Sequence, residues 1–372
     1  MAVTSDTNIK MELPSVFRRI STTCCKTRSS LGLQKSSPPS TSSIVPEPTT
    51  SANYSRGGKP IKVTLIHNPS AGEDAQASGE RIVQLIRAAG HKVNYRSSKD
   101  RKWKKALKKT CDIVAVAGGD GTVGKVARRL IGSRTPLAIL PMGTANNIAN
   151  TLGITGRSLQ QLIKGWNTAR CINFDAGVAK GPWGSRCFIE GFGTGLFAEV
   201  MYQLKGEKNN GLPSSGKSSE VINSVLAVLK KQLQGYRSIK MTVRLDGQDV
   251  SCDYVLLEAL NIGHIGPNLD LVSRVDINDG FFDVVFVAKR ERAKLSRYLT
   301  DRISRKRSRP KLTTRRGRHL QIEWESSPVH IDDTPWPEDE EGIPVRSTAI
   351  DVKIQPGALV FLVPKKRRRV RQ

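Results

Sequence analysis

The stretch 112–130, DIVAVAGGDGTVGKVARRL, constrains the fold of this chain more than any other. Its apolar residues 113–117 are typical of a short buried strand in a parallel sheet. Gly118, Gly119 and Gly121 follow directly, so the backbone can turn sharply and come close to a ligand. Apolar residues then recur at helical spacing. A strand, a glycine turn and a helix N-terminus bind anions, because free N–H groups and the helix dipole point to one place. The stretch therefore predicts a phosphate site.

Three phosphate-binding motifs overlap in this turn. Gly119, Gly121 and Gly124 have the spacing of the dinucleotide fingerprint, but that motif needs an acidic residue at the end of the next strand, which ends here in Pro141. The same residues nearly match the P-loop, although a valine stands where that motif needs a magnesium-binding hydroxyl. The third interpretation takes GGDGT, residues 118–122, as one unit with a carboxylate and a hydroxyl in the turn. We prefer the third interpretation because of the turn that follows.

A second turn follows the next expected strand, 137–140. Its sequence, LPMGTANN from Leu140, brings small and polar residues to a place where they could reach the same phosphates. A third turn of this kind follows the first expected strand, 61–67. The carboxyl ends of parallel strands meet at one edge of a sheet, so the three turns are expected to converge. The expected phosphate-binding residues are Asn68, Gly118, Gly119, Asp120, Gly121, Thr122, Gly143, Thr144 and Asn146.

GGDGT followed at this distance by P-x-GTAN resembles the catalytic domain of the diacylglycerol kinase family, which includes bacterial lipid kinases and sphingosine kinases. The resemblance continues through FIEGFG at 188–193, NDGFFD at 278–283 and IQPGAL at 354–359. It therefore covers about 59–364, most of the chain. The resemblance implies ATP and Mg²⁺ as cofactors, with ATP held in the cleft between two domains.

The chain departs from the family pattern beside the glycine turn. Gly124 and Lys125 stand where the family usually has Asn-Glu, and Asn147 stands where it usually has Asp. The loss of the Asn-Glu pair removes polar groups next to the expected nucleotide pocket. Lys125 could compensate by facing a phosphate, and a solvated helix lysine is the ordinary alternative.

The order of expected elements predicts two domains. Strands alternate with helices over 59–169, which predicts an α/β nucleotide domain with a doubly wound parallel sheet. Frequent strands over 170–348 predict a mostly antiparallel second domain, and the resemblance implies a β-sandwich-like lipid-binding domain, with 349–364 returning to the first domain. Residues 1–58, rich in Ser, Thr and Pro, predict a disordered leader, and 365–372 form a basic tail.

The charge of the chain favours an anionic partner. Lys and Arg number 60 against 33 Asp and Glu, a net charge of +27. Residues 289–318 contain an amphipathic basic helix of the membrane-surface type. Aromatic residues make up 5% of the chain and no nucleic-acid-binding signature accompanies the cations, which disfavours nucleic acid. We therefore expect a lipid substrate at an anionic membrane surface and a cytoplasmic, membrane-peripheral location. The acid-poor leader also fits organelle targeting, and a homodimer stays open.

Carboxylates in loops are the candidates for the proton acceptor. The resemblance implies that an Asp-Gly after the strand near 329–332 supplies it, which maps to Asp332. Asp333 replaces the glycine here, so the choice between the two acids stays open. Asp120 is expected to meet the metal or the acceptor, and a helix-capping acid is the alternative for it. Two close carboxylates repel, so one can hold its proton more tightly, which suits a base.

The structural magnesium site of the family maps onto the Asp279 side chain and the backbone carbonyls of Asp276 and Phe281. Oxygen ligands suit a hard cation. An ordinary Asn-Asp-Gly hairpin turn at 278–280 would explain the same residues without a metal. His67, His264 and His330 show no partners in the sequence, and we assign them no role.

These observations predict an ATP-dependent lipid kinase that phosphorylates a hydroxyl of diacylglycerol or a related membrane lipid. Phosphoryl transfer needs a bound nucleotide, an acceptor hydroxyl in line with the γ-phosphate and a base. Two alternatives remain. One is an NAD-kinase-like enzyme that phosphorylates a soluble nucleotide, and the other is a non-enzymatic basic protein that binds nucleic acid.

Overall fold

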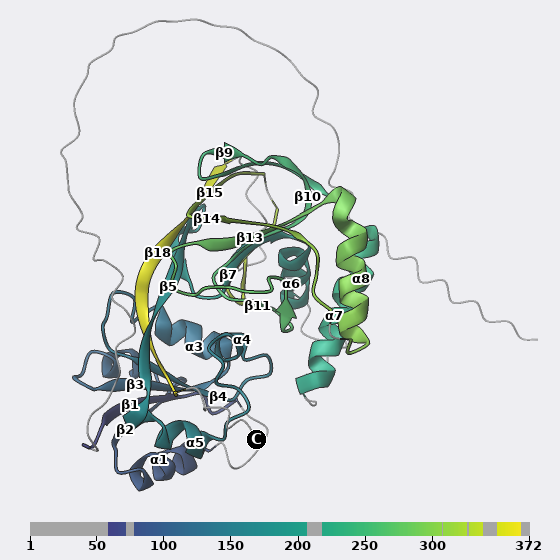
Figure 1. The fold of residues 1–372 in the computed structure, drawn as a ribbon. Helices are drawn as coiled ribbons and strands as arrows, with labels where there is room; N and C mark the ends of the chain where they lie inside the picture. Colours follow the sequence, from purple (N-terminus) through teal and green to yellow (C-terminus); the bar gives the residue numbers. More distant parts are fainter. Residues whose placement is uncertain are drawn as a thin grey trace, which may run out of the picture. The chain divides into compact units, whose positions relative to one another are not determined.

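The computed structural model describes residues 59–71, 78–206, 218–306, 308–325, 327–337 and 348–365. The expected leader lies outside these residues, as does the expected basic tail beyond Lys365. Within them, the predicted architecture is confirmed: an α/β part is followed by a β-rich part (Figure 1).

The α/β part is built around a parallel sheet. Its strands are β1 (Lys62–His67), β2 (Lys92–Ser97), β3 (Ile113–Gly118) and β4 (Leu137–Pro141). They pair in the order β2-β1-β3-β4, and every pairing among them is parallel. The helices are α1 (Gly79–Ala88), α2 (Trp103–Ala106), α3 (Asp120–Ala127), α4 (Asn147–Thr151) and α5 (Leu159–Lys164). In Figure 1, α1 and α5 lie on one side of the sheet and α3 and α4 on the other.

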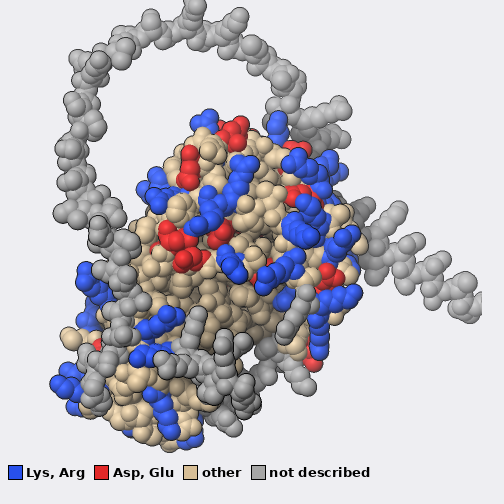
Figure 2. Space-filling view, viewed as in Figure 1, with Lys and Arg blue, Asp and Glu red and all other residues tan. Residues whose placement is uncertain are grey.

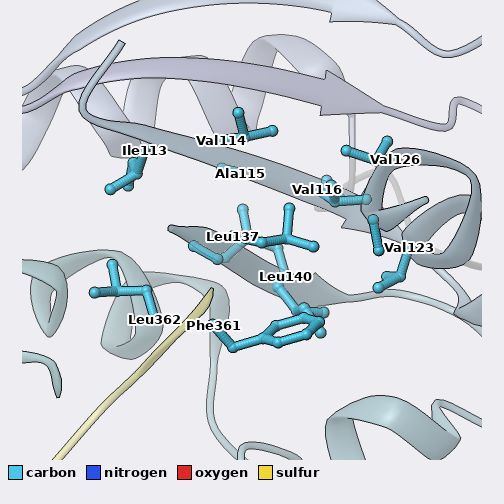
Figure 3. Close-up of a cluster of buried hydrophobic side chains, with 14 of the residues drawn as sticks. Ile113, Val114, Ala115, Val116, Val123, Val126, Leu137, Leu140, Phe361 and Leu362 are labelled. Carbon is cyan, nitrogen blue, oxygen red and sulfur yellow. The ribbon is translucent and has the colours of Figure 1, made fainter. Parts of the chain in front are cut away.

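The glycine turn stands on a fully buried strand. Every residue of β3 is buried, because helices cover both faces of the sheet, and this explains its unbroken run of apolar residues. Figure 3 shows Val123 and Val126 of α3 beside the β3 side chains, with Leu140 and Phe361 in the same cluster. The apolar side chains of α3 therefore pack the helix against the sheet. This packing fixes the direction in which the N-terminus of α3 points.

The β-rich part is antiparallel. Its main strands are β5 (Arg170–Gly181), β6 (Gly184–Phe188), β7 (Gly191–Gly195), β8 (Ile239–Leu245), β10 (Cys252–Leu260), β13 (Phe282–Ala288), β14 (Thr313–Gly317), β15 (His319–Trp324), β16 (Val329–Ile331) and β17 (Thr334–Trp336). Two-residue strands are β9 (Gln248–Asp249), β11 (His264–Ile265) and β12 (Leu269–Asp270). The helices are α6 (Leu196–Gly206), α7 (Ser218–Gly235) and α8 (Arg292–Ile303). Pairings among its strands are antiparallel.

The strand β18 (Thr348–Val363) joins the two parts. It pairs antiparallel with β15 and β5, and near its end Phe361 pairs with Leu137 of β4 in parallel. Its register against β5 shifts between Gln355 and Leu359, where the strand bulges. One continuous strand therefore contributes to the core of the β-rich part and to the core of the α/β part.

The basic segment after β13 does not present the membrane-surface helix that its sequence suggests. The apolar face of α8, formed by Leu295, Tyr298 and Leu299, is buried in the core beneath it, so this face is not free to enter a bilayer. Figure 2 shows Lys and Arg side chains gathered over this part of the surface. Exposed Lys and Arg residues on α8 and its immediate flanks include Lys289, Arg290, Lys294, Arg297, Arg305 and Lys306. None of the described helices combines the length and the apolar character that crossing a bilayer requires.

Candidate active site

The first two predicted turns lie in direct backbone contact. Gly119 caps the N-terminus of α3, and Gly143 follows β4. A Cβ atom on Gly143 would lie 2.4 Å from the Cα of Gly119, a distance that real Cβ atoms do not show. The backbone N–H of Met142 also donates to the carbonyl of Gly118 at 3.0 Å. Only glycine allows the two turns to approach this closely.

The polar residues of the three turns surround this contact. The Asn68 side-chain amide donates to the Thr122 hydroxyl at 3.3 Å, which links the turn after β1 to the turn after β3. Asn146 has a left-handed backbone with φ of 51°, and its side-chain oxygen accepts from the backbone N–H of Gly143 at 2.9 Å. Thr144, between them, is exposed. The structure thus brings together Asn68, Gly118–Thr122 and Gly143–Asn146, as the sequence predicts; their role in binding phosphate stays a prediction.

Asp120 caps a helix other than its own. Its two carboxylate oxygens accept from the backbone N–H groups of Asn147 at 2.8 Å and Ile148 at 3.0 Å, at the start of α4. The carboxylate therefore binds the N-terminal N–H groups of a helix that begins far along the chain. Burial raises the pKa of Asp120, these two hydrogen bonds oppose the rise, and the nearby charge of Asp333 adds to it. Asp120 therefore acts as a helix-capping acid in this structure, although the helix is α4 and not its own. A direct role of Asp120 in the reaction stays a prediction.

Asp332 comes from the β-rich part and reaches the α/β part. It follows β16 in a left-handed conformation with φ of 54°, and it is buried. One carboxylate oxygen, Oδ1, accepts from the backbone N–H groups of Ile189 at 2.9 Å and Glu190 at 2.7 Å. The other, Oδ2, forms an ion pair with the guanidinium of Arg128 on α3. Burial raises the pKa of Asp332, while Arg128 and the backbone N–H groups lower it in part.

The turn at 332–333 packs against α3 at two glycines, Gly121 and Gly124. A Cβ atom on Gly121 would lie 2.3 Å from Oδ2 of Asp333, and one on Gly124 would lie 3.7 Å from Oδ2 of Asp332. The two glycines are three residues apart, so they lie on one face of the helix. Their bare backbone lets the acidic turn come close to the glycine turn after β3.

His330 and Glu258 form a buried pair behind Asp332. Nε2 of His330 lies 2.8 Å from Oε2 of Glu258, and Nδ1 lies 3.0 Å from the carbonyl oxygen of Asp332 and donates to it. Both side chains are fully buried. Burial by itself lowers the pKa of His330, but the Glu258 carboxylate and the two hydrogen bonds raise it above its ordinary value. The pair therefore holds the backbone of Asp332 in its left-handed conformation.

Sequence reasoning missed several residues of this site: Arg128, Glu190, Glu258 and His330. Glu190 stands inside the FIEGFG motif, which was the one available signal. The side-chain amide of Asn147 donates to Glu190 at 3.2 Å. Burial raises the pKa of Glu190 well above its usual value, and the carboxylates of Asp120 and Asp332 raise it further. The site is thus a group of close acids, with Arg128 paired into it.

The predicted magnesium ligands lie in a tight turn before β13. Oδ1 of Asp279 accepts from the backbone N–H of Phe281 at 3.0 Å, and Oδ2 forms an ion pair with Arg316. Asp276 caps its own turn by accepting from the backbone N–H of Asn278 at 3.2 Å. The Asp279 carboxylate is therefore already paired with a guanidinium. No cluster of three or more metal-binding side chains occurs among the described residues. The hairpin-turn alternative describes these contacts, and the metal site stays a prediction.

A cavity of about 360 Å³ opens beside the acids. Asp120, Glu190, Asp332 and Asp333 line one end of it. The rest of the lining is largely apolar, and α6 and α7, which pack against each other, contribute most of its side chains. The turn after β4 and residues 265–267 at β11 complete it. The wall residues on these helices are Phe197, Val200, Met201, Leu204, Val221, Ile222, Val225 and Leu229. The cavity can thus hold an apolar molecule whose polar end meets the carboxylates.

Two family descriptions match the chain. Residues 62–178 match the diacylglycerol kinase catalytic domain, and residues 219–363 match the YegS C-terminal NAD kinase beta sandwich-like domain. The chain thus combines a diacylglycerol kinase catalytic domain with a YegS-type C-terminal domain. It is a kinase, a phosphotransferase with an alcohol group as the acceptor.

Relatives and solved structures agree with this family. The chain is 25% identical to a diacylglycerol kinase of Bacillus subtilis over 253 residues, which cover 64% of this chain and 78% of the relative. It is 25% identical to a diacylglycerol kinase of Mycobacterium tuberculosis over 256 residues, which cover 63% and 76%. The crystal structure of a diacylglycerol kinase from Bacillus anthracis matches with a TM-score of 0.60 at 20% identity, over 82% of this chain and 97% of that one. This likeness shows that the two-part fold is shared.

Replacing Glu190 with Gln should stabilise the protein at neutral pH. Its folded-state pKa is raised, so Glu190 favours folding below its unfolded pKa and loses this contribution as the pH rises through the folded pKa. Glutamine keeps an oxygen for Asn147 and carries no charge. We expect the free energy of unfolding in urea to rise by roughly 1–3 kcal/mol at about pH 8 and to change little at about pH 4. The exposed Glu80→Gln is the matched control. An equal change at both pH values would contradict the prediction.

Proposed function

We propose that this protein is an ATP-dependent lipid kinase that phosphorylates a hydroxyl of diacylglycerol or a related membrane lipid. The observation that carries the proposal is the cavity: an apolar wall from α6 and α7 leads to buried carboxylates that adjoin the glycine turn. An apolar tail would lie along the helices, and a hydroxyl at its end would meet the acids. A soluble nucleotide acceptor would be a poor match for such a wall. The relatives are named diacylglycerol kinases, which supports the same substrate class.

In this proposal ATP lies over the paired glycine turns. The N-terminus of α3 directs backbone N–H groups toward the space above Gly119, and Gly143 leaves that space free of side chains. Asn68, Thr122 and Asn146 surround the contact with polar groups that can bind phosphate oxygens. The γ-phosphate would then face the acidic end of the cavity.

Asp332 is the proposed proton acceptor. Its carboxylate lines the cavity, and burial raises its pKa toward the range in which a carboxylate takes a proton readily. The lipid hydroxyl gives its proton to Asp332 as its oxygen forms a bond to the γ-phosphorus. The bond between that phosphorus and the bridging oxygen breaks at the same time, and ADP leaves with the electron pair. Asp333 is the second candidate because it lines the same cavity.

Magnesium is proposed as the partner of the bound nucleotide, where it would neutralise phosphate charge. Asp120 is the acid of the glycine turn, but both of its oxygens accept hydrogen bonds from α4. Asp276 and Asp279 lie in a turn where Arg316 already pairs with Asp279.

We further propose that the enzyme acts as a cytoplasmic protein at an anionic membrane surface. Its net charge is +27, and exposed cations gather over α8. Each Lys or Arg near an anionic bilayer contributes about 1 kcal/mol, and the contribution falls off within a Debye length. The apolar face of α8 is buried, so attraction by charge rather than insertion of this helix would hold the protein there.

The decisive experiment supplies labelled ATP and magnesium to the purified protein with anionic vesicles that contain diacylglycerol, a sphingoid base or neither. We expect labelled lipid from one of the lipid acceptors. Asp332→Asn should lower kcat by about 10²–10⁴-fold and leave ATP binding nearly unchanged, and the exposed Asp253→Asn is its control. Labelled NADP from dispersed NAD without lipid would favour the nucleotide-kinase alternative. Salt-dependent DNA binding without any turnover would favour the third alternative.

Gly143→Ala should weaken ATP binding by forcing the two turns apart. The added methyl would meet the backbone of Gly119 at 2.4 Å, and a backbone atom cannot yield as a flexible side chain can. We expect a loss of roughly tenfold or more in affinity, about 1.4 kcal/mol, by isothermal titration with ATP. Gly235→Ala adds the same methyl where nothing lies within 4 Å, so it should bind ATP normally. Equal affinity in the two variants would refute this placement of ATP.

Val225→Arg should impair the use of lipid without affecting ATP. Val225 lines the apolar wall on α7, and a charged side chain there would disfavour an acyl chain. We expect KM for the vesicle lipid to rise by roughly tenfold, with the affinity for ATP unchanged. Ala227→Arg places the same charge at an exposed position of α7 and serves as the control. Unchanged lipid kinetics in Val225→Arg would show that the acyl chain lies elsewhere.

A further inference from the structure

Arg128 reaches the proposed proton acceptor by folding back along its own helix. It stands at the C-terminal end of α3, and its guanidinium forms an ion pair with Oδ2 of Asp332. The path of its side chain lies over Gly124, one helical turn earlier. A Cβ atom on Gly124 would lie 3.1 Å from Nη1 of Arg128, tighter than an ordinary contact. The side chain can take this path because Gly124 has none.

We propose that Arg128 is a positioning residue for Asp332 and that glycine at position 124 is what admits it. The inference rests on the proposed function, in which Asp332 accepts the proton of the lipid hydroxyl. It also accounts for the departure from the family pattern beside the glycine turn, where Gly124-Lys125 replaces Asn-Glu. Lys125 is exposed, so Arg128 is the basic side chain of α3 that takes part in the site.

The surroundings of Asp332 explain why a cation is needed there. Several charged and titratable groups face Asp332. They are Asp120, Arg128, Cys187, Glu190, His330 and Asp333. Three of these groups, Asp120, Glu190 and Asp333, are carboxylic acids, and like charges at close range favour protonation of the carboxylate. A protonated Asp332 cannot accept the proton of a hydroxyl. Arg128 opposes this effect and favours the ionised form of Asp332.

The ion pair also fixes the orientation of the carboxylate. Backbone N–H groups of residues 189 and 190 bind Oδ1, and Arg128 binds Oδ2. The carboxylate is therefore held at both oxygens while it lines the cavity. Loss of Arg128 would free one of them to rotate and would remove the opposing charge.

The test measures lipid phosphorylation by Arg128→Gln and Arg128→Lys in the full-length protein with anionic vesicles. We expect Arg128→Gln to lower kcat by roughly 10–100-fold, with little change in KM for ATP. The acidic limb of its kcat–pH profile should move to higher pH, because its base holds a proton more tightly. Arg128→Lys should recover part of kcat. Arg129→Gln is the matched control, since its guanidinium lies over the ring of Trp103 and away from Asp332.

The role of Gly124 is tested by comparing the effect of a Gly124 substitution with and without Arg128. Gly124→Asn should lower kcat in the wild-type background and have a clearly smaller effect in the Arg128→Gln background, where the long side chain that it displaces is gone and only its contact with the acidic turn is left. Equal effects in both backgrounds, or no effect in either, would overturn the part of the inference that concerns Gly124. Wild-type kcat and an unshifted pH profile in Arg128→Gln, with Asp332→Asn inactive, would overturn the role of Arg128 and leave the proposed function standing.

A second measurement does not depend on catalysis. The urea midpoints of Arg128→Gln, Asp332→Asn and the double variant form a double-mutant cycle. We expect the downward shift caused by Arg128→Gln to be smaller in the Asp332→Asn background, where no buried charge is left unpaired. Additive shifts would overturn the ion pair itself. Absence of phosphorylation of any lipid by the wild-type protein, with coupled shifts, would refute the proposed function while the pair remained established.

Discussion

The candidate site depends on the close approach of one acidic turn to one face of a helix. The turn at 332–333 comes from the β-rich part, and it can lie on α3 because positions 121 and 124 carry no side chains. Burying the Asp332 carboxylate costs free energy unless donors and a cation surround it. The backbone N–H groups after β6, the Arg128 guanidinium and the His330–Glu258 pair behind the turn supply this support. The site is therefore assembled only when both parts of the chain are folded.

The elements with strong local patterns could be predicted from the sequence. An unbroken apolar strand, a run of glycines and apolar residues at helical spacing specify β3, the turn and α3 with little reference to the rest of the chain. The convergence of Asn68 with Thr122 followed from the general rule that parallel strands end at one edge of the sheet. These elements could be predicted because residues close together in the sequence determine them.

The contacts that cross the chain could not be predicted in the same way. The helix that Asp120 caps begins at Asn147, and nothing near Asp120 reports this. Arg128 is one of many basic residues, and only the fold shows that it pairs with an acid from the other part. The apolar face of α8 shows a different limit of prediction from sequence. A helix face that packs in the protein core and one that enters a bilayer have the same periodicity of apolar residues.

The strand β18 has a consequence for the order in which the protein forms during synthesis. Phe361 pairs with Leu137, and most of the chain lies between them. A ribosome delivers the α/β part first, yet the edge of its sheet beside β4 stays uncovered until β18 emerges. While the β-rich part is translated, the nascent α/β part either exposes apolar surface at this edge or has it covered transiently. Chaperone demand should therefore last until β18 has been synthesised.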